Sequence, residues 1–500
     1  MLIVTVDTKR LEYDIHSLVK AFYPEKTVKV EFAAVMEEAE DEQKPFMQIR
    51  LRGSKPSLTI WGDREHNKRK YPLSARIPET DETDKLPAAF KNEFKKELYQ
   101  ALSDFTDKTL PWGNLTGIRP TKIAVGMLSE GRTDAQIAAF MQENHFVSEE
   151  KAKLAIGIAH RETQLLKPLH VKEGYSLYIG IPFCPTTCLY CSFTSYPICA
   201  YEKIVEEYID CVIKEMNYVA KAYRDKKLDS VYIGGGTPTT LMPCQLDRLL
   251  SQLEETFDLS GLSEFTVEAG RADSITREKL EVLKKHGVSR ISVNPQTMKA
   301  DTLALIGRHH TVEQVKEAFL LARELGFDNI NMDLILGLPG EGVLDVQHTM
   351  DEVAGLKPDS LTVHSLAVKR ASRLRRWIDE NGIAALKNTD ETMAVAAAKA
   401  EELGMKPYYL YRQKNMAGNF ENVGYAKPGK YSIYNILIME EVQTIMALGA
   451  GSISKIVLPG GRIERADNVK DVKLYMEKID EMLSRKEALF CLQKNEGWLD

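Results

Sequence analysis

No run of apolar residues in this 500-residue chain approaches the roughly 20 residues that a membrane-spanning helix needs. The first residues, MLIVTVDTKRLEYD, place charges directly after a very short apolar run, which is not the pattern of a signal peptide. We therefore expect a protein with no membrane span and no secretory signal.

The chain also lacks an excess of basic residues. Lys and Arg number 66 against 72 Asp and Glu, which leaves a formal net charge of −6, and no arginine-rich run offsets it. This balance argues against a nucleic acid partner. Cysteine is scarce as well: the seven cysteines are an odd number and mostly scattered. That usage indicates a reducing compartment, and we expect the cytoplasm.

The length of the chain, 500 residues, exceeds what one simple core can hold, so we expect two or three domains. Residues 1 to about 62 contain four β-rich segments, and helical patterns run from Leu86 to about residue 166. We predict an α+β domain of unknown role over residues 1–170. Its stretch PWGNLTGIRPTKI favours a solvated loop, although Arg119 and Lys122 would also suit an anion.

Three of the cysteines lie close together in the run IPFCPTTCLYCSF, with the spacing C-x3-C-x2-C: Cys184, Cys188 and Cys191. Thiolate sulfur suits zinc or iron–sulfur clusters, but structural zinc and an ordinary four-iron cluster each take four protein ligands. Three ligands therefore indicate a four-iron cluster with one iron left open for chemistry. The alternative is three unrelated buried thiols, which such tight spacing disfavours. Cys199 is near enough to be a ligand, but Pro197 and the helix after it favour a bystander.

From about residue 175, six strand-like segments alternate with helical ones: SLYIGI, VYIGG, EFTVEA, RISVNP, NINMDLILG and SLTVHSL. Such alternation predicts parallel strands joined by right-handed crossovers, either as an open doubly wound sheet or as a full or partial barrel. Notable residues follow the strand ends, among them Asn294 and His364, and polar residues gathered there are typical of a barrel active site. We predict an α/β fold in which these strands form a full or partial barrel. Residues 371–500 are expected to form a helical and loop region that covers it.

Other residues at the strand ends suggest ligand contacts. The run GGGTPT, Gly234 to Thr239, lets a backbone approach a ligand, although a tight turn is the alternative. Glu268 ends a strand where a carboxylate is costly unless it is paired, although a solvated acid would also fit. Asp333 interrupts the apolar run NINMDLILGLP and needs a partner such as a ligand hydroxyl, amine or sulfonium.

The cysteine loop, with Tyr190 before its third cysteine, resembles the signature of radical S-adenosylmethionine (SAM) enzymes. The closer resemblance is to oxygen-independent coproporphyrinogen III oxidases, through YIGIPFCPTTCLYC, YIGGGTPT, the spacing from Gln296 to Arg308, NMDLILGLPG and LGAGSIS, over roughly residues 175–455. The resemblance implies that the barrel is a partial (β/α)6 TIM-like barrel of the radical SAM type, over residues 171–370. It also implies a [4Fe-4S] cluster held by the three cysteines, with SAM as the exchangeable ligand of the open iron.

The same resemblance implies two sets of SAM contacts. The contacts to the cluster-bound SAM would be Tyr178, Gly235 and Glu268. The contacts to a second SAM nearby would be Gly236, Thr237, Gln296, Arg308 and Asp333. The implied reaction is the oxidative decarboxylation of porphyrinogen propionates to vinyl groups in haem biosynthesis. Its partners would be a porphyrinogen or other tetrapyrrole and a reduced flavodoxin- or ferredoxin-type electron donor.

Two departures make this chain a divergent member of that family. The oxidases carry a further cysteine two residues after the third ligand, where this chain has Phe193, as in the haem-chaperone branch. The chaperones carry an HNxxYW motif where this chain reads YNILIM from Tyr434. Two alternatives therefore stay open: a haem-binding chaperone, and a radical SAM enzyme that acts on another tetrapyrrole.

A cationic cluster follows the last predicted strand: Lys369, Arg370, Arg373, Arg375 and Arg376. Arginine suits the carboxylates of a tetrapyrrole, but a solvated basic helix face explains the cluster equally well. His364 could be a haem ligand or proton donor, and a hydrogen-bonded strand-end histidine is the favoured alternative.

Overall fold

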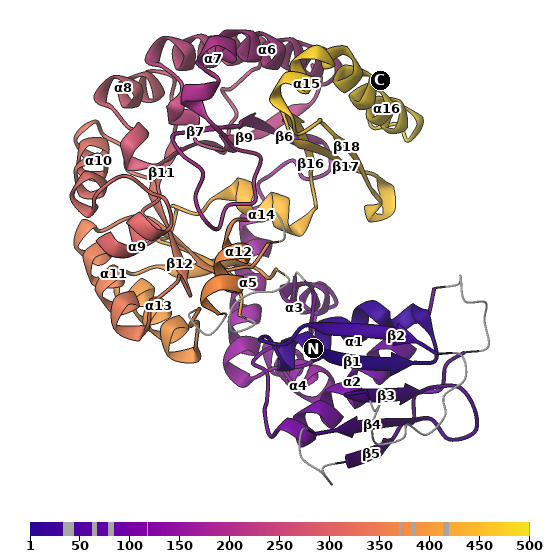
Figure 1. Cartoon of the computed structure of the whole chain (residues 1–500). Coiled ribbons are helices and arrows are strands. Elements are labelled where there is room, and N and C mark those ends of the chain that lie inside the picture. Colours follow the sequence, from indigo (N-terminus) through magenta and orange to yellow (C-terminus); the bar gives the residue numbers. More distant parts are fainter. Residues whose placement is uncertain are drawn as a thin grey trace. The chain divides into compact units, whose positions relative to one another are not determined.

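The computed structural model describes residues 1–33, 45–62, 68–78, 85–117, 119–369, 372–382, 386–413 and 420–499. The chain divides into two compact units (Figure 1). The first contains Met1–Ala159 and Arg412–Glu421, and the second contains His160–Tyr411 and Asn422–Asp500. No helix in the described ranges is long and apolar enough to cross a membrane.

The first unit is built on a five-stranded sheet in the order β2-β1-β3-β4-β5. Its strands are β1 (Leu2–Val6), β2 (Val28–Phe32), β3 (Met47–Arg50), β4 (Ser57–Trp61) and β5 (Lys68–Pro72). Strand β1 is parallel to β2 and β3, whereas β4 is antiparallel to both of its neighbours. The four predicted strands are present. Strand β5, with its exposed Lys and Arg residues, was not predicted.

The helices of this unit are α1 (Glu12–Phe22), α2 (Ala88–Thr106), α3 (Thr121–Ser129), α4 (Asp134–His145) and the start of α5 (Glu149–Leu166). Helix α1 was not predicted, although its buried residues Ile15, Leu18, Val19 and Phe22 have the spacing of one helical face. These side chains pack with residues of β1, β3, β4 and α2 in one apolar core. The core explains why this part of the chain folds as a unit.

The PWGNLTGIRPTKI stretch differs from the expected solvated loop at its start. The side chain of Trp112 is fully buried, and its Nε1 donates a hydrogen bond to Glu421 Oε2 at 2.7 Å. The same carboxylate forms a buried ion pair with Lys151, with a distance of 2.8 Å from Nζ to Oε1. Gly113 has φ +53°, and a Cβ there would lie 1.8 Å from the carbonyl oxygen of His145. The stretch therefore begins inside the first unit, because its aromatic side chain and its glycine pack there.

The second unit contains an eleven-stranded sheet in the order β14-β15-β13-β12-β11-β10-β9-β6-β16-β17-β18. Its central strands are β6 (Gly174–Ile181), β9 (Lys227–Gly235), β10 (Glu264–Gly270), β11 (Arg290–Val293), β12 (Ile330–Leu336) and β13 (Ser360–Ser365). Each pairs in parallel with its neighbours in this set. These are the six predicted strands, and their nearly continuous burial is what a sheet covered on both faces requires.

Helices cover the outer side of this curved sheet (Figure 1). They are α6 (Val205–Ala222), α7 (Pro243–Thr256), α8 (Arg277–Lys285), α10 (Val312–Glu324) and α11 (Val343–Leu356), with the short α9 (Ala300–Leu305) between β11 and α10. Among the described strands the sheet does not close, because β14 and β18 stand at its two ends. The predicted α/β fold with a partial, open barrel is confirmed.

The C-terminal residues do more than cover the barrel. Strands β14 (Lys406–Tyr411) and β15 (Asn422–Ala426) extend the sheet beside β13, and β16 (Thr444–Leu448) pairs in parallel with β6. The antiparallel strands β17 (Ile453–Val457) and β18 (Ile463–Asp467) complete that edge. Helices α12 (Leu374–Asn381), α13 (Asp390–Glu402), α14 (Ile433–Glu440), α15 (Val472–Glu477) and α16 (Ile479–Asn495) complete the region. The expected helical and loop region therefore also supplies strands to both edges of the sheet.

Candidate functional site

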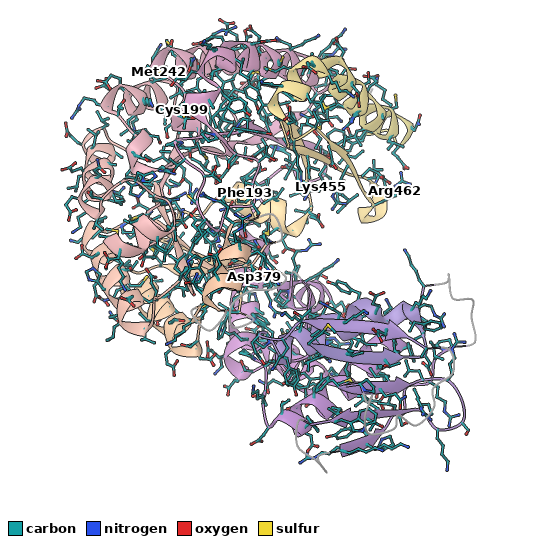
Figure 2. All side chains as sticks on the ribbon, viewed as in Figure 1. Phe193, Cys199, Met242, Asp379, Lys455 and Arg462 are labelled. Carbon is teal, nitrogen blue, oxygen red and sulfur yellow. The ribbon has the colours of Figure 1, made fainter. Side chains whose placement is uncertain are left out.

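The three clustered cysteines lie in a loop at the carboxyl end of β6. The short strand β7 (Phe183–Cys184) pairs with β8 (Tyr196–Pro197) and so closes the loop at its base. Within the loop, the backbone N–H of Cys191 donates to the carbonyl of Cys188 at 3.2 Å. Cys184 and Cys188 are buried, Cys191 is half-buried, and none is in a disulfide. Cys199, labelled in Figure 2, is exposed on the segment that follows the loop.

Burial is the main cause of the pKa shifts of Cys184 and Cys191. It raises the pKa of Cys184 to about 11, against a hydrogen-bond contact of 3.5 Å between Cys184 Sγ and Thr237 Oγ1. Burial also raises the pKa of Cys191, and the neighbouring Cys188 adds to that increase. In the described ranges, no group of three or more His, Cys, Asp or Glu side chains is assembled as a metal site. The donor set nevertheless suits an iron–sulfur cluster, because three soft thiols share one short, anchored loop.

The glycine run after β9 lies directly against this loop. A Cβ on Gly236 would lie 2.5 Å from the carbonyl oxygen of Phe183 and 3.0 Å from Cys184 Sγ. A Cβ on Gly234 would lie 3.0 Å from Cδ of Glu268. The 2.5 Å distance is too short for a real Cβ contact, and the two distances of 3.0 Å are tight enough that the neighbouring atoms would have to shift. The run is therefore required for the close approach of β9 to its neighbours, as well as for a turn.

Tyr178, the residue on β6 expected to contact SAM, belongs to a group of stacked tyrosines. Gly235, with φ +108°, would place a Cβ 3.4 Å from Tyr178 Oη. The ring of Tyr178 stacks at 6.2 Å on both Tyr232 and Tyr434, and those two rings stack at 4.5 Å. The functional interpretation of the sequence missed Tyr232. Tyr434 was noted only as the residue that replaces the first histidine of the chaperone motif.

Glu268 lies beside this stack, where Tyr232 donates its hydroxyl hydrogen bond to Oε1 at 2.5 Å. Burial raises the pKa of Glu268 to about 7, the bond from Tyr232 acts in the opposite direction, and the charge of Asp333 raises it further. A carboxyl group in this state changes charge near neutral pH. It is therefore well suited to pair with a cationic ligand group that stabilises the ionised form.

Gln296, Arg308 and Asp333 meet around Asn294, just after β11. The guanidinium of Arg308 donates through Nη1 to the backbone carbonyl of Asn294, and through Nη2 to Tyr190 Oη at 3.3 Å. The Oδ1 of Asn294 accepts from the backbone N–H of Asp333 at 3.2 Å. Contacts therefore run from the cysteine loop, through Arg308 and Asn294, to Asp333.

Gln296 has a backbone conformation that is unusual for a residue with a side chain. Its φ is +70°, in the left-handed region, and its backbone exchanges hydrogen bonds with β12. The N–H of Gln296 donates to the carbonyl of Asp333 at 3.0 Å, and its carbonyl accepts from Ile335 at 2.9 Å. Strained conformations of this kind cluster at functional sites, where the surrounding structure holds them.

Asp333 is partnered on both sides. Asn331 Nδ2 donates to its Oδ1 at 2.7 Å, and His364 Nε2 lies 3.8 Å from its Oδ2. Burial alone would raise the pKa of Asp333, but His364, Asn331 and Thr362 together lower it. The other ring nitrogen of His364 is 3.4 Å from Tyr411 Oη. This arrangement agrees with the hydrogen-bonded strand-end histidine that the sequence favoured.

The expected cationic cluster is only partly gathered around the site. The guanidinium of Arg373 donates to a backbone carbonyl of the cysteine loop. Lys369 is half-buried, and burial lowers its pKa. Arg375 and Arg376 are exposed on α12, and Arg370 lies outside the described residues. The described part of the cluster fits a solvated basic face as well as a carboxylate-binding surface.

Sequence reasoning missed Arg271, which directly follows β10. It is 2% exposed, and its Nη1 donates to Thr186 in the cysteine loop at 2.7 Å. The signal for it was the position of an arginine immediately after the carboxyl end of a barrel strand, next to Glu268 and Gly270.

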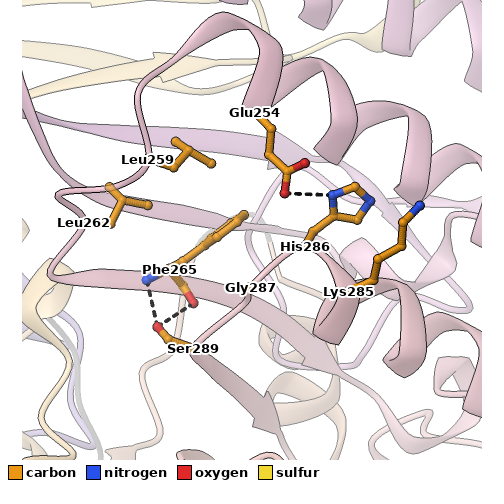
Figure 3. A pocket seen from close by; sticks show the side chains of 8 residues that line it. All are labelled: Glu254, Leu259, Leu262, Phe265, Lys285, His286, Gly287 and Ser289. Carbon is orange, nitrogen blue, oxygen red and sulfur yellow. Dashed lines mark hydrogen bonds and ion pairs between the residues drawn. The ribbon is translucent and has the colours of Figure 1, made fainter.

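A separate cavity of about 390 Å³ lies at the opposite end of the strands (Figure 3). It is bounded by Phe265 and Ser289, at the starts of β10 and β11, and by His286. The two ring nitrogens of His286 lie 2.9 Å from Asp247 and 2.9 Å from Glu254. Residues at the amino ends of barrel strands usually contribute stability rather than catalysis, so we do not include this cavity in the site.

Comparisons with known proteins show which proteins this chain resembles in sequence and fold. The model of the family described as "Radical SAM superfamily" matches residues 178–353. The chain is 43% identical over 401 residues to "Oxygen-independent coproporphyrinogen-III oxidase-like protein HemZ" of Bacillus subtilis, covering 79% of this chain and 80% of the relative. It is 34% identical over 310 residues to "Heme chaperone HemW" of the same organism, covering 61% and 76%. The solved coproporphyrinogen III oxidase HemN of Escherichia coli aligns with a TM-score of 0.51 at 24% identity, over 64% of this chain and 72% of that chain.

Proposed function

Because this chain belongs to the radical SAM superfamily, in the group that contains the coproporphyrinogen III oxidase-like proteins, we propose that it is an oxygen-independent oxidase of this type. It would remove CO2 from propionate side chains of a porphyrinogen and leave vinyl groups. The family implies an iron–sulfur cluster and SAM. A reduced flavodoxin- or ferredoxin-type protein would supply electrons.

Cys184, Cys188 and Cys191 would hold the [4Fe-4S] cluster, with SAM as the exchangeable ligand of the fourth iron. When bound, these groups supply a 5′-deoxyadenosyl radical that takes a hydrogen atom from the substrate. The chain's own contribution is to hold the reacting groups in place and to keep water away. The burial of two of the three cysteines supports that role.

Tyr178, Gly235 and Glu268 would contact the cluster-bound SAM. Glu268 is the residue suited to the amino group, because an N–H donor beside it favours the ionised carboxylate as acceptor. The proton that Glu268 holds near neutral pH would then leave as SAM binds. Gly235 and its neighbours present backbone amides without side chains, which suits the SAM carboxylate.

Gly236, Thr237, Gln296, Arg308 and Asp333 would contact a second SAM. The observation that carries the proposal is the chain of contacts from Tyr190 through Arg308 and Asn294 to Asp333. This chain of contacts links the cysteine loop to two of the residues expected to contact the second SAM, Arg308 and Asp333. The strained backbone of Gln296 supports the proposal, because strained backbone conformations are found most often at functional sites.

A haem-binding chaperone is the second candidate. The 34% identity to a haem chaperone favours it, and so does Phe193, which is 76% exposed (Figure 2). The absence of the HNxxYW pattern argues against it. At that position Tyr434 packs its ring on Tyr178 and Tyr232.

An anaerobic assay with reconstituted cluster, SAM, a strong reductant and coproporphyrinogen III separates these functions. Loss of CO2 by mass spectrometry, with 5′-deoxyadenosine formed, is the expected result. 5′-Deoxyadenosine without decarboxylation would indicate a radical SAM enzyme with another substrate. If neither product forms and the protein binds haem in a one-to-one ratio, the chaperone function replaces the proposed one.

A further inference from the structure

Arg271 is a buried cation that the assigned SAM contacts do not include. Strand β10 has an irregular register between Glu268 and Gly270, and Gly270 has φ +59°. Irregularities of this kind re-aim the side chain that follows. Here they turn the chain after β10, and the guanidinium of Arg271 reaches the cysteine loop.

Two residues of the cysteine loop, Thr186 and Cys188, contact this guanidinium. Nη1 donates to the backbone carbonyl of Thr186 at 3.0 Å and to its Oγ1 at 2.7 Å. The same nitrogen lies 4.0 Å from Cys188 Sγ, a hydrogen-bonding distance for sulfur. A full positive charge is therefore placed against one of the three proposed cluster ligands.

Asp273 holds the guanidinium from the other side. Its two oxygens accept from Nε at 2.9 Å and from Nη2 at 2.5 Å, which is the bidentate geometry that fixes an arginine most firmly. Behind Asp273 lies His310, whose side chain is fully buried and whose Nδ1 is 3.7 Å from Oδ1. Burial alone would raise the pKa of Asp273, but His310 and Arg271 lower it. The carboxylate is ionised, and the orientation of Arg271 is fixed.

We propose that Arg271, held in place by Asp273, is a positioning residue that makes the iron–sulfur cluster easier to reduce. Reduction adds one electron to the cluster, and a nearby positive charge stabilises that added negative charge. Reduction potentials of such clusters depend on local charge and on hydrogen bonds to the ligand sulfurs. The inference rests on the proposed function, because it needs a cluster bound at Cys184, Cys188 and Cys191.

The test compares two variants. Arg271→Met removes the positive charge, whereas Arg271→Lys keeps the charge but loses the bidentate hydrogen bonds of the guanidinium. Each protein is reconstituted anaerobically with iron and sulfide and analysed for both. It is then titrated with titanium(III) citrate while the reduced cluster is followed by electron paramagnetic resonance. Arg277→Met is the matched control, since Arg277 forms an exposed ion pair with Glu324.

In Arg271→Met we expect the ratio of reduced to oxidised cluster at a fixed potential to fall at least tenfold. For a one-electron reduction, this corresponds to a decrease of about 59 mV in the reduction potential of the cluster. Arg271→Lys should lie between this variant and the wild type, and Arg277→Met should match the wild type. A loaded Arg271→Met cluster with the wild-type potential would overturn the inference and leave the proposed function standing.

The remaining outcomes are also decisive. If the wild-type protein takes up no cluster, the proposed function fails, and the inference fails with it. If Arg271→Met loses its iron while Arg271→Lys keeps it, the potential of Arg271→Lys decides: a value below that of the wild type supports the inference, and the wild-type value refutes it. If both lose it, Arg271 only braces the loop, and its role in reduction is refuted.

Discussion

The substitution Lys486→Met should destabilise the second unit strongly. Lys486 on α16 and Glu215 on α6 are both completely buried, with Nζ 2.5 Å from Oε1. The carboxylate of Glu215 also accepts bonds from Asn468 at 2.8 Å, from the N–H of Gly449 at 2.7 Å and from Tyr475 at 2.6 Å. Removing the lysine leaves a buried carboxylate without its counter-charge. A loss of this kind costs about 3–5 kcal/mol of unfolding free energy.

This network also supports the candidate site. Tyr208 donates to the carbonyl of Gly180 at 2.6 Å and accepts from the N–H of Ala450 at 3.0 Å. Gly449, held by Glu215, would place a Cβ 2.4 Å from that same carbonyl oxygen. The loop after β16 and the end of β6, just before the cysteine loop, are therefore fixed together. Lys486→Met should also reduce the iron retained after reconstitution.

Urea unfolding followed by circular dichroism measures the stability change. Lys214→Met is the control, because Lys214 pairs with Asp480 between the same two helices but at the surface, at 2.6 Å. That substitution should cost less than about 1 kcal/mol. The double variant Glu215→Gln with Lys486→Met should be more stable than Lys486→Met alone, since no unpaired charge remains. If Lys486→Met costs no more than the surface control, the argument from the unpaired buried charge is wrong.

Three further predictions concern the proposed cofactors. Alanine at Cys184, Cys188 or Cys191 should each abolish the iron–sulfur absorbance after anaerobic reconstitution; intact absorbance in all three variants would end the cluster assignment. Asp333→Ala should weaken equilibrium binding of SAM to the loaded protein and leave the iron content unchanged, whereas equal affinity would refute its role. Because the pKa of Glu268 is raised to about 7, its negative charge is lost as the pH falls through that value. SAM affinity should therefore decrease below pH 7 in the wild type but not in Glu268→Gln, and parallel pH profiles for the two would contradict the assigned contact.

The predicted strands of the barrel could be found because their signals are local. SLYIGI, VYIGG and EFTVEA are short runs of mostly apolar residues, and each forms a largely buried strand. Strand β16 was missed, although TIMAL is equally apolar, because nothing in its sequence shows that it pairs in parallel with β6. The left-handed backbone of Gln296 was missed for a similar reason. Its partners Asp333 and Ile335 lie on another strand.

The sequence by itself determined the superfamily and the type of fold, because the signals for both lie in the spacing of residues along the chain. Three cysteines within eight residues share one loop in any fold, and alternating strands and helices lead to a parallel sheet. The tertiary structure alone decided which side chains face that loop. Arg271 contacts Thr186, which is 85 residues away in the sequence, and Lys486 contacts Glu215, which is 271 residues away. Contacts between residues so far apart in the sequence depend on how helices and strands pack and on which buried charges need partners. A local sequence pattern contains neither kind of information.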